Sequence, residues 1–451
     1  MTATATALPA DSGFLQQDDP TGATADATIP FRSLLPKPDH PRIAGIETHD
    51  AHTWCGSRRQ VPAPAWLISR LDLENLEKPY KGFSVDGKPD GSVWKYEQDE
   101  GAPIEAAMEA TNKLLAVLST EEKKEVIKGD VAVDDEFRAW SNPELYMNPG
   151  GIRLDETRAE VQDAVHDVLR ACLSPQGYEK ALGCTLTNHF LGELVNGLKV
   201  LNKHSYNFRL FLPEVGQHES RTPSSTAPWG WSFFGHHLCL NVMFVGRRMV
   251  IAPTFSGAEP DSIDAGPHAG LRLFKEEEEY SLKLMQSLSP ENQKKAQLNE
   301  GMTAQEGLAE DRWNPFDERH LGGARQDNRT VPYEGCPVSS FSPEQKTVLY
   351  EVLKAFNAYL PAKPLEAQLA RLKQYEDQMY FAWIGKFGDR DPYYYRIHSP
   401  VTFCEFDFHC GIFLTNTRPA KCHIHTVNRF PNIGDYGKAL IRQWKSEQGQ
   451  A

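Results

Sequence analysis

Residues 393–436 read YYYRIHSPVTFCEFDFHCGIFLTNTRPAKCHIHTVNRFPNIGDY, and this stretch decides the fold that we expect. Apolar and aromatic residues alternate in it with polar ones, which is the period of a half-buried strand. Proline and glycine stand between the alternating runs, as they do in turns between strands. The stretch therefore predicts short β-strands joined by loops.

The polar positions of this stretch carry side chains that bind metals. Glu405, Asp407 and His409 occupy every second position of one run, and His423 and His425 do the same in the next. Because successive side chains of a strand point to opposite faces, each set projects from one face of its own strand. Two neighbouring strands would bring three imidazoles and two carboxylates together, which are ligands that divalent metals prefer.

The rest of the chain predicts helices around a sheet. Apolar residues recur at helical spacing in segments that begin after capping signals such as Ser119 and the SPEQ sequence at Ser342. The helical segments are 104–125, 155–173, 176–201, 271–288, 342–359 and 365–378, and the strand-like ones are 208–212 and 228–257. This order of elements predicts an α+β fold with a mostly antiparallel sheet flanked by helices.

Composition divides the chain into two parts. Residues 1–40 are rich in Ala, Thr, Asp and Pro and predict a mobile N-terminal arm, whereas residues 41–451 predict a single domain. Within that domain we expect a small hairpin at 83–91, a solvated charged face at 276–279, and an excursion over the surface at 299–340. No internal repeat at a fixed period is visible.

Charge and hydropathy exclude several classes of protein. The chain has 451 residues, 40% of them hydrophobic, and a net charge of −13, so we expect neither a clustered cationic surface nor nucleic acid as a partner. No apolar stretch approaches the roughly 18 residues of a spanning helix, and the N-terminus does not resemble a signal peptide. The eight cysteines form no CxxC pair, which fits reduced thiols. We therefore expect a cytoplasmic protein without a membrane partner.

Several motifs together resemble one known family. They are FSVDGKPDG, RAWSNPELYMNPGGIRLDE, LSPQGY, WGWSFFGHHLCLNVMFV with APTFSGAEP, YYYRIHSPVTFCEFDFHCG, and HIHTVNRFPNIGDYG. In this combination of GHH, Glu-x-Asp, HxH and DYG, the chain resembles the domain of unknown function 3500 family of bacteria and fungi, from about residue 70 to the C-terminus. The resemblance implies no settled activity, so it indicates where the site lies and not what happens there.

Four histidines are the candidate metal ligands. His423 and His425 form an HxH pair on one strand face, a common ligand spacing. His236 and His237 are adjacent and cannot share a strand face, so we expect one of them, with a slight preference for His237, to join the pair. The competing interpretation is that these are core histidines bonded to backbone.

Charged residues near the histidines supply the remaining candidates. Glu405 lies in an apolar strand, where an ionised carboxylate needs a cation or several donors, so we expect a ligand or general base at Glu405 or Asp407. Arg396 and Arg429 are placed to bind a substrate carboxylate, or alternatively to pair with Glu405 and Asp435 in a network that braces the sheet. Asp435 is also a candidate cap for a final helix over 436–444.

These residues predict a metal-dependent enzyme that acts on a small organic molecule. We favour an oxidoreductase or oxygenase of specialised metabolism with iron or copper, because imidazole ligands with open positions suit those ions. The first alternative is a zinc-dependent hydrolase in which Glu405 activates water, and the second is a non-catalytic binding or scaffold protein. A cysteine nucleophile at Cys404, Cys410 or Cys422 is less favoured, and the sequence leaves the oligomeric state open.

Overall fold

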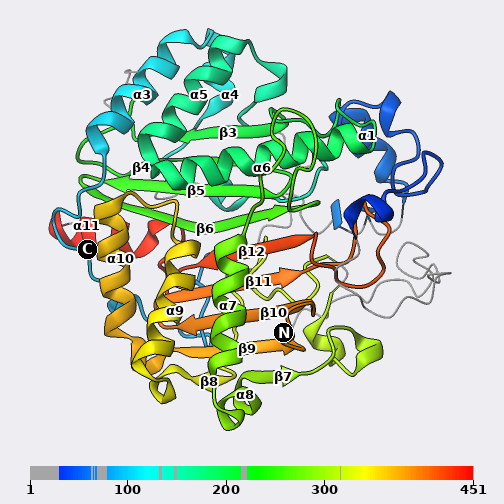
Figure 1. Ribbon diagram of the computed structural model, residues 1–451. Coiled ribbons are helices and arrows are strands. Elements are labelled where there is room, and N and C mark those ends of the chain that lie inside the picture. Colours follow the sequence, from blue (N-terminus) through cyan, green and yellow to red (C-terminus); the bar gives the residue numbers. More distant parts are fainter. Residues whose placement is uncertain are drawn as a thin grey trace.

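The computed structural model describes most of the chain and shows an α+β fold (Figure 1). The described residues are 30–61, 64–65, 67–68, 79–131, 135–146, 150–214, 221–314 and 316–449. Their helices are α1 (Ala51–Arg58), α3 (Ile104–Val117), α4 (Thr120–Val126), α5 (Ala159–Cys172), α6 (Pro175–Leu194), α7 (Lys275–Ser287), α8 (Pro290–Ala296), α9 (Pro343–Phe356), α10 (Ala362–Gln374) and α11 (Lys438–Glu447).

The strands form one continuous sheet. Within the described residues it has 12 strands, with the order β1-β3-β4-β5-β6-β12-β11-β10-β9-β7, while β2 pairs with β3 and β8 with β9. The strands are β1 (Ile127–Lys128), β2 (Ile152–Arg153), β3 (Tyr206–Phe211), β4 (Trp229–Gly235), β5 (Leu238–Val245), β6 (Arg248–Ala258), β7 (Gln297–Asn299), β8 (Cys336–Pro337), β9 (Tyr380–Gly385), β10 (Tyr393–Ser399), β11 (Thr402–Phe408) and β12 (Ile424–Arg429). The predicted mostly antiparallel sheet is confirmed.

The same order of elements runs twice through the chain. The series α3-α4-β1-β2-α5-α6-β3-β4-β5-β6 is followed by α7-α8-β7-β8-α9-α10-β9-β10-β11-β12. In each half the short first strand pairs in parallel with the third, and the second pairs antiparallel with that same strand. The halves meet where β6 pairs with β12. This repeat was not predicted, because the halves share hydrophobic pattern and element order rather than a fixed spacing of residues.

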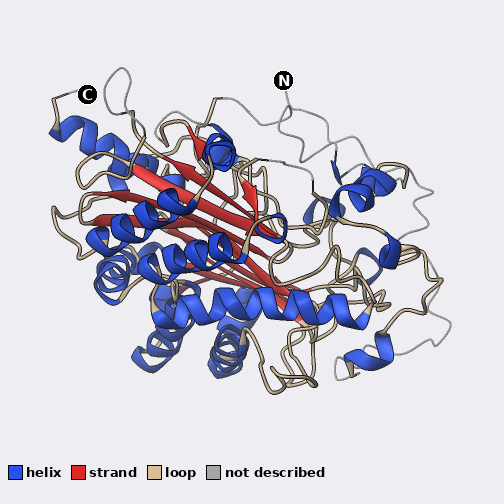
Figure 2. Ribbon diagram, turned by 90° about the horizontal axis from the view of Figure 1, so that it is seen from above, coloured by secondary structure: helices blue, strands red, loops and turns tan. Residues whose placement is uncertain are grey.

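The two faces of the sheet are covered differently. On β10, the hydroxyls of Tyr393 and Tyr395 donate to backbone carbonyls of α7, so this face packs on the helices. Figure 2 shows most of the helices gathered on one side of the strands. Tyr394, Asp407 and His425 are cross-strand partners on β10, β11 and β12 and therefore share the opposite face. Loops cover that face, and it carries the candidate site.

Capping residues in the sequence correctly predicted the starts of two helices. Ser119 and Ser342 begin their helices with reciprocal capping boxes, as predicted. Asp435 does not cap the final helix, because α11 begins at Lys438 and the Asp435 carboxylate accepts from the Phe430 backbone N–H instead. The predicted hairpin at 83–91 is also wrong, since only an isolated bridge at Ser84 appears there.

Two segments expected at the surface are buried. In the run at 276–279, Glu277 pairs with Lys180 and Glu278 with Lys421, and both glutamates are buried. These lysines neutralise the carboxylates and let α7 pack against the sheet. Residues 317–324, within the predicted surface excursion, fold over the sheet as a buried segment. Both predictions failed because polar residues in the sequence were assumed to be exposed to solvent.

The predicted N-terminal arm is only partly described. Residues 1–29 lie outside the described residues. Phe31–Leu34 form a 3₁₀ turn whose Phe31 ring packs on Phe190, and the Leu34 carbonyl accepts from the Thr415 N–H. The packed domain therefore begins before residue 41.

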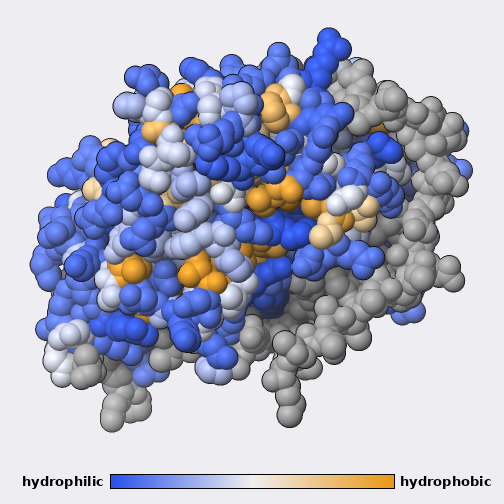
Figure 3. Space-filling model, turned by 90° about the horizontal axis from the view of Figure 1, so that it is seen from below, coloured by the Kyte–Doolittle hydropathy of each residue, from blue (hydrophilic) through white to orange (hydrophobic). Residues whose placement is uncertain are grey.

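The surface gives little sign of an apolar docking face. Figure 3 shows a mainly hydrophilic face with scattered hydrophobic residues. Leu198 and Leu298 are the large hydrophobic side chains that are exposed in the part of the chain that the structure describes. In that same part, none of the helices combines the length and the apolar character that crossing a membrane requires.

Candidate metal centre

Three imidazoles meet at one end of the β6–β12 pair. The Nε2 atoms of His423 and His425 are 3.0 Å apart, and the Nε2 atom of His237 lies 3.3 Å from the first and 3.1 Å from the second. All three side chains are buried, His425 being the most exposed at 5%. We call His237, His423 and His425 the histidine trio; the HxH pair and the preferred member of the GHH pair are thus brought together, as predicted.

His237 reaches the trio from a strained turn between two strands. It is the second residue of the two-residue turn between β4 and β5 and has φ +62°, a left-handed conformation that costs a non-glycine residue energy. Its backbone is held on both sides, because its N–H donates to Asn142 and its carbonyl accepts from Gly257. The matching turn of the second half is Pro400–Val401, which carries no imidazole, so the site is asymmetric.

Gly257 keeps the space in which the trio converges. A Cβ at this position on β6 would lie 2.9 Å from the Cδ2 atom of His425 and 3.1 Å from that of His237. Both distances are shorter than normal carbon–carbon contacts. Glycine is therefore required for the two rings to approach each other across the strand.

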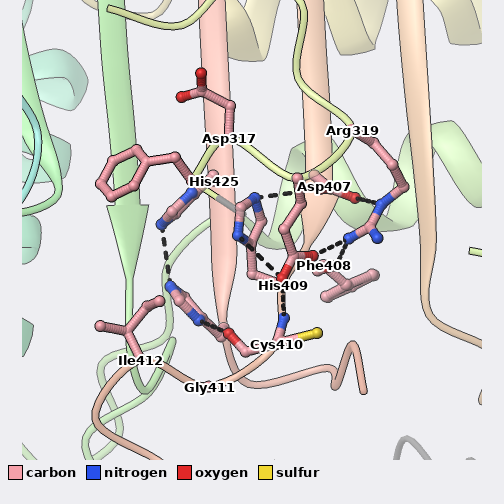
Figure 4. Close-up of polar contacts among 12 residues, drawn as sticks. Asp317, Arg319, Asp407, Phe408, His409, Cys410, Gly411, Ile412 and His425 are labelled. Carbon is pink, nitrogen blue, oxygen red and sulfur yellow. Dashed lines mark hydrogen bonds and ion pairs between the residues drawn. The ribbon is translucent and has the colours of Figure 1, made fainter. Parts of the chain in front are cut away.

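The tautomer of His423 is fixed by its loop. Its Nδ1 atom lies 2.6 Å from the Cys410 carbonyl oxygen, which can only accept, so Nδ1 carries the proton and Nε2 presents a lone pair to the trio. The loop after Cys410 is itself held by the buried Glu259 carboxylate, which accepts the backbone N–H groups of Ile412, Phe413 and Leu414. Figure 4 shows Cys410, Gly411 and Ile412 of this loop near His425.

Burial favours the neutral form of His237 and His425. It lowers the pKa of His237 and His425 well below the ordinary value for histidine, and neighbouring imidazoles lower both further. Among the described residues, each trio Nε2 atom has only the other two as neighbours within hydrogen-bonding distance. The Nε2 lone pair of His423 faces the other two rings where the three Nε2 atoms converge.

The trio fits a transition-metal ion. Two nitrogens that bind one ion at 2.0–2.1 Å lie roughly 2.9–3.4 Å apart for angles between octahedral and tetrahedral. The three Nε2 separations of 3.0–3.3 Å fall in this range without any movement of the side chains. Three protein ligands on one side of an ion leave positions open on the other, as in catalytic sites.

His236 has a different role. Its Nδ1 atom lies 2.8 Å from the Asn188 side-chain oxygen, and its ring stacks on His237 with centroids 3.8 Å apart. Burial lowers the pKa of His236 to about 3. It therefore supports His237 from behind, and of the two adjacent histidines it is His237 that lies next to His423 and His425.

Glu405 lies outside the trio. Its oxygens accept from the backbone N–H groups of Leu321 and Gly322 and from the Tyr394 hydroxyl. Burial acts to raise the pKa of Glu405, but His320 and Tyr394 outweigh it and the pKa falls to about 2. As predicted for a buried carboxylate, it has several donors. Through these donors Glu405 anchors the 317–324 segment, and it is not part of the trio.

Asp407 lies beside the trio on the same face. Arg319 donates from Nε to its Oδ1 atom at 2.8 Å, and its Oδ2 atom lies 3.2 Å from Nε2 of His409 (Figure 4). Burial raises the pKa of Asp407 to about 7, against the opposing effect of Arg319. The ring of His409 in turn lies against that of His425, with centroids 3.9 Å apart and the ring planes tilted by 43°.

The two predicted arginines differ. Arg429 uses four of its five N–H groups: it donates to Asp327 at 3.0 Å, to Asp435 at 2.8 Å and to two backbone carbonyls, so it braces the sheet. The network interpretation is correct for this residue. Arg396 donates to Glu334 at 2.6 Å, while its Nη1 atom has no partner among the described residues. Its role toward a substrate stays a prediction.

His320 is a candidate that the sequence did not reveal. It lies in the 317–324 segment, is 2% exposed, and faces Glu405 and His409 from above the sheet. The sequence ERHLGG does not alternate apolar and polar residues as a strand does. The position of His320 depends on the long-range contact between this segment and β11. The signal that was overlooked is a histidine beside two glycines, whose backbone can approach a neighbouring side chain closely.

Residues 100–438 match the family described as Protein of unknown function (DUF3500), and this range is most of the chain. The chain belongs to this family. The resemblance seen in the motifs is thereby confirmed, although the match starts later than residue 70. No curated protein and no solved structure matches the chain. Membership in DUF3500 therefore gives the family without an activity.

In this DUF3500 protein the cysteines near the trio are not activated. Burial raises the pKa of Cys410 well above its ordinary value and that of Cys404 to about 12. A thiol with a raised pKa stays protonated and is a poor nucleophile. The geometry therefore gives no support to a cysteine nucleophile.

Proposed function

We propose that this protein is a metal-dependent enzyme that acts on a small organic molecule, with the ion held by His237, His423 and His425. The convergence of three Nε2 atoms within 3.3 Å of one another carries this proposal. A divalent iron or copper ion suits an all-imidazole set with open positions, and zinc is the alternative. When bound, such an ion supplies a Lewis-acidic or redox-active centre for a substrate.

An oxidoreductase or oxygenase is the reaction class that we favour. A hydrolase would need a base that reaches water at the ion, and Glu405 was the candidate. Its carboxylate instead holds two backbone N–H groups and a tyrosine hydroxyl, which weaken it as a base. The zinc hydrolase is therefore our second choice. A non-catalytic bracing role suits Arg429 better than the trio, because Arg429 donates to two carboxylates and two carbonyls, whereas the trio Nε2 atoms lie near one another and, within the described part of the chain, within hydrogen-bonding distance of no carboxylate or carbonyl.

The residues of the chain would divide the work among them. The His237, His423 and His425 rings would hold the ion. Cys410 would fix the tautomer of His423 through its carbonyl, and Arg396 would offer its free Nη1 to a substrate carboxylate. We place this chemistry in the cytosol, because all eight cysteines are free thiols. No surface feature of the described residues leads us to propose a nucleic-acid partner.

Metal and oxygen measurements on untagged protein test this function. The expected result is iron or copper that co-purifies with the chain, and oxygen consumption that depends on it when candidate organic substrates are supplied. Zinc alone, with ester or amide hydrolysis, would favour the hydrolase. Absence of any transition metal after expression in metal-supplemented medium would overturn the proposal.

A further inference from the structure

A second group of metal-binding side chains lies beside the trio. His320, Asp407 and His409 each offer one ligand atom, and these atoms lie within 4.8 Å of one another. The three residues are at most 2% exposed. They come from two places in the chain, the 317–324 segment and the end of β11, which the Glu405 contacts join.

The carboxylate and the two imidazoles of this group are turned toward one another. Nδ1 of His320 faces Glu405 at 3.6 Å and Nδ1 of His409 faces Glu318 at 3.8 Å, so each ring has a carboxylate behind it and its Nε2 on the other side. Arg319 takes one oxygen of Asp407 and leaves Oδ2 facing His409. A carboxylate behind an imidazole is the usual arrangement around histidines that bind metals.

The atoms that face inward lack hydrogen bonds. Within the described residues, both ring nitrogens of His320, the Nε2 atom of His409 and the Oδ2 atom of Asp407 are buried and have no hydrogen-bond partner. Nδ1 of His320 faces Glu405, so three of these atoms, one from each residue, face one another, with Oδ2 of Asp407 3.2 Å from Nε2 of His409. Buried polar atoms in native proteins are rarely left unpaired, and one cation could be the common partner of these three. Two imidazoles and a carboxylate are ligands that a divalent transition-metal ion takes.

We propose that His320, Asp407 and His409 bind a second divalent transition-metal ion, so that this protein carries a two-metal centre. The inference rests on the proposed function of the trio for its first ion. The two groups are contiguous, because the ring centroid of His409 lies 3.9 Å from that of His425 and 5.3 Å from that of His423. Adjacent ions can bind one substrate together.

The second ion is expected to bind more weakly than the first. Arg319 donates to Oδ1 of Asp407 at 2.8 Å, and its positive charge repels a cation at this carboxylate. Mild chelation should therefore remove one ion before the other.

Cobalt(II) titration of the metal-depleted, full-length protein tests the second site. We expect the wild type to bind two cobalt ions per chain and Asp407→Asn and His320→Gln to bind one, with the tighter ion retained. Asp435→Asn is the matched control, since Asp435 is an equally buried carboxylate paired with an arginine on the same sheet, and it should still bind two. His320→Gln alters a loop rather than a strand and decides the matter where Asp407→Asn does not fold.

The possible outcomes separate the two proposals. Two ions in the wild type, with one lost in both variants and none lost in the control, support the second site. One ion in the wild type that is unaffected by either variant overturns it and leaves the trio intact. Two ions that persist in both variants also overturn the assignment of these ligands. No bound cobalt in the wild type overturns the proposed function as well.

Discussion

The two ends of β12 carry buried polar clusters that differ in how they are satisfied. At its C-terminal end, Arg429 donates to Asp327, Asp435 and two carbonyls, so charge meets charge and donors meet acceptors. At its N-terminal end, His423 turns a lone pair toward His425 and His237, and in the part of the chain that the structure describes the three Nε2 atoms have only one another within hydrogen-bonding distance. Both clusters are buried on the same face of the same sheet.

This difference distinguishes bracing from binding. A buried network whose charges and hydrogen bonds are complete stabilises a fold and offers nothing to a ligand. A cluster whose acceptors converge without donors is incomplete, and a cation completes it. The amino-acid sequence does not distinguish these two clusters, because both lie in similar stretches of alternating apolar and polar residues.

Breaking the brace should give the largest loss of stability. Arg429→Met leaves Asp435 buried without its cation, and we expect the free energy of unfolding in urea to fall by about 3–5 kcal/mol. The metal content of the protein that remains folded should not change. Arg247→Met removes an exposed arginine with two surface pairs and should cost less than about 1 kcal/mol. Equal losses in the free energy of unfolding for the two variants would contradict a bracing role for Arg429.

Removing one ring of the trio should act on metal binding instead. His425→Ala is expected to lower metal affinity by at least about 100-fold, which exceeds the usual effect of a residue behind a ligand. His398→Ala is the control, because His398 is an equally buried histidine on β10 outside both groups. Competition with a chromophoric chelator measures both. Similar affinities for the two variants would mean that the trio is not the site.

Glu405→Gln should separate the anchor of the 317–324 segment from the trio. The amide cannot accept every donor that the carboxylate accepts from Leu321, Gly322 and Tyr394, so the free energy of unfolding should fall by about 1.5–3 kcal/mol. Amide hydrogen exchange in this segment should accelerate, while the tighter metal ion stays bound. Loss of that ion with an unchanged segment would instead make Glu405 a ligand.

Filling the space at Gly257 should give the smallest effect. The added methyl of Gly257→Ala meets two rings of the trio, and we expect about 1–3 kcal/mol of lost stability together with roughly tenfold weaker metal binding. Gly56→Ala, where a Cβ meets nothing within 4 Å, should be neutral or slightly stabilising. Metal binding that is unchanged by Gly257→Ala would show that the rings need not approach so closely.

Strand parity explains which site residues could be predicted. His423 and His425 share a face because they are two residues apart, and Asp407 follows from the same rule on β11. The choice of His237 over His236 depended on a left-handed turn that no local pattern specifies. His320 could not be placed at all, because its position is set by backbone contacts to Glu405 across more than 80 residues.

The fold was predictable at the level of class and not of symmetry. Period-two and helical spacing predicted the sheet and its helices, since burial on one face imposes those periods. The doubled order of elements went unseen, because the trio takes His237 from the first half and His423 and His425 from the second, and because the connecting loops differ in length. A two-residue turn joins β5 to β6, whereas residues 409–423 join β11 to β12 and bring His423 to the site.

Metal content per chain tests the central claim most directly. Elemental analysis of the untagged wild type, purified without chelators, should find at least one first-row transition-metal ion per chain, and the His423→Ala, His425→Ala double variant should lose the tightly bound ion while remaining folded. A wild type that is free of such metals, or a double variant with the same content as the wild type, would contradict the account.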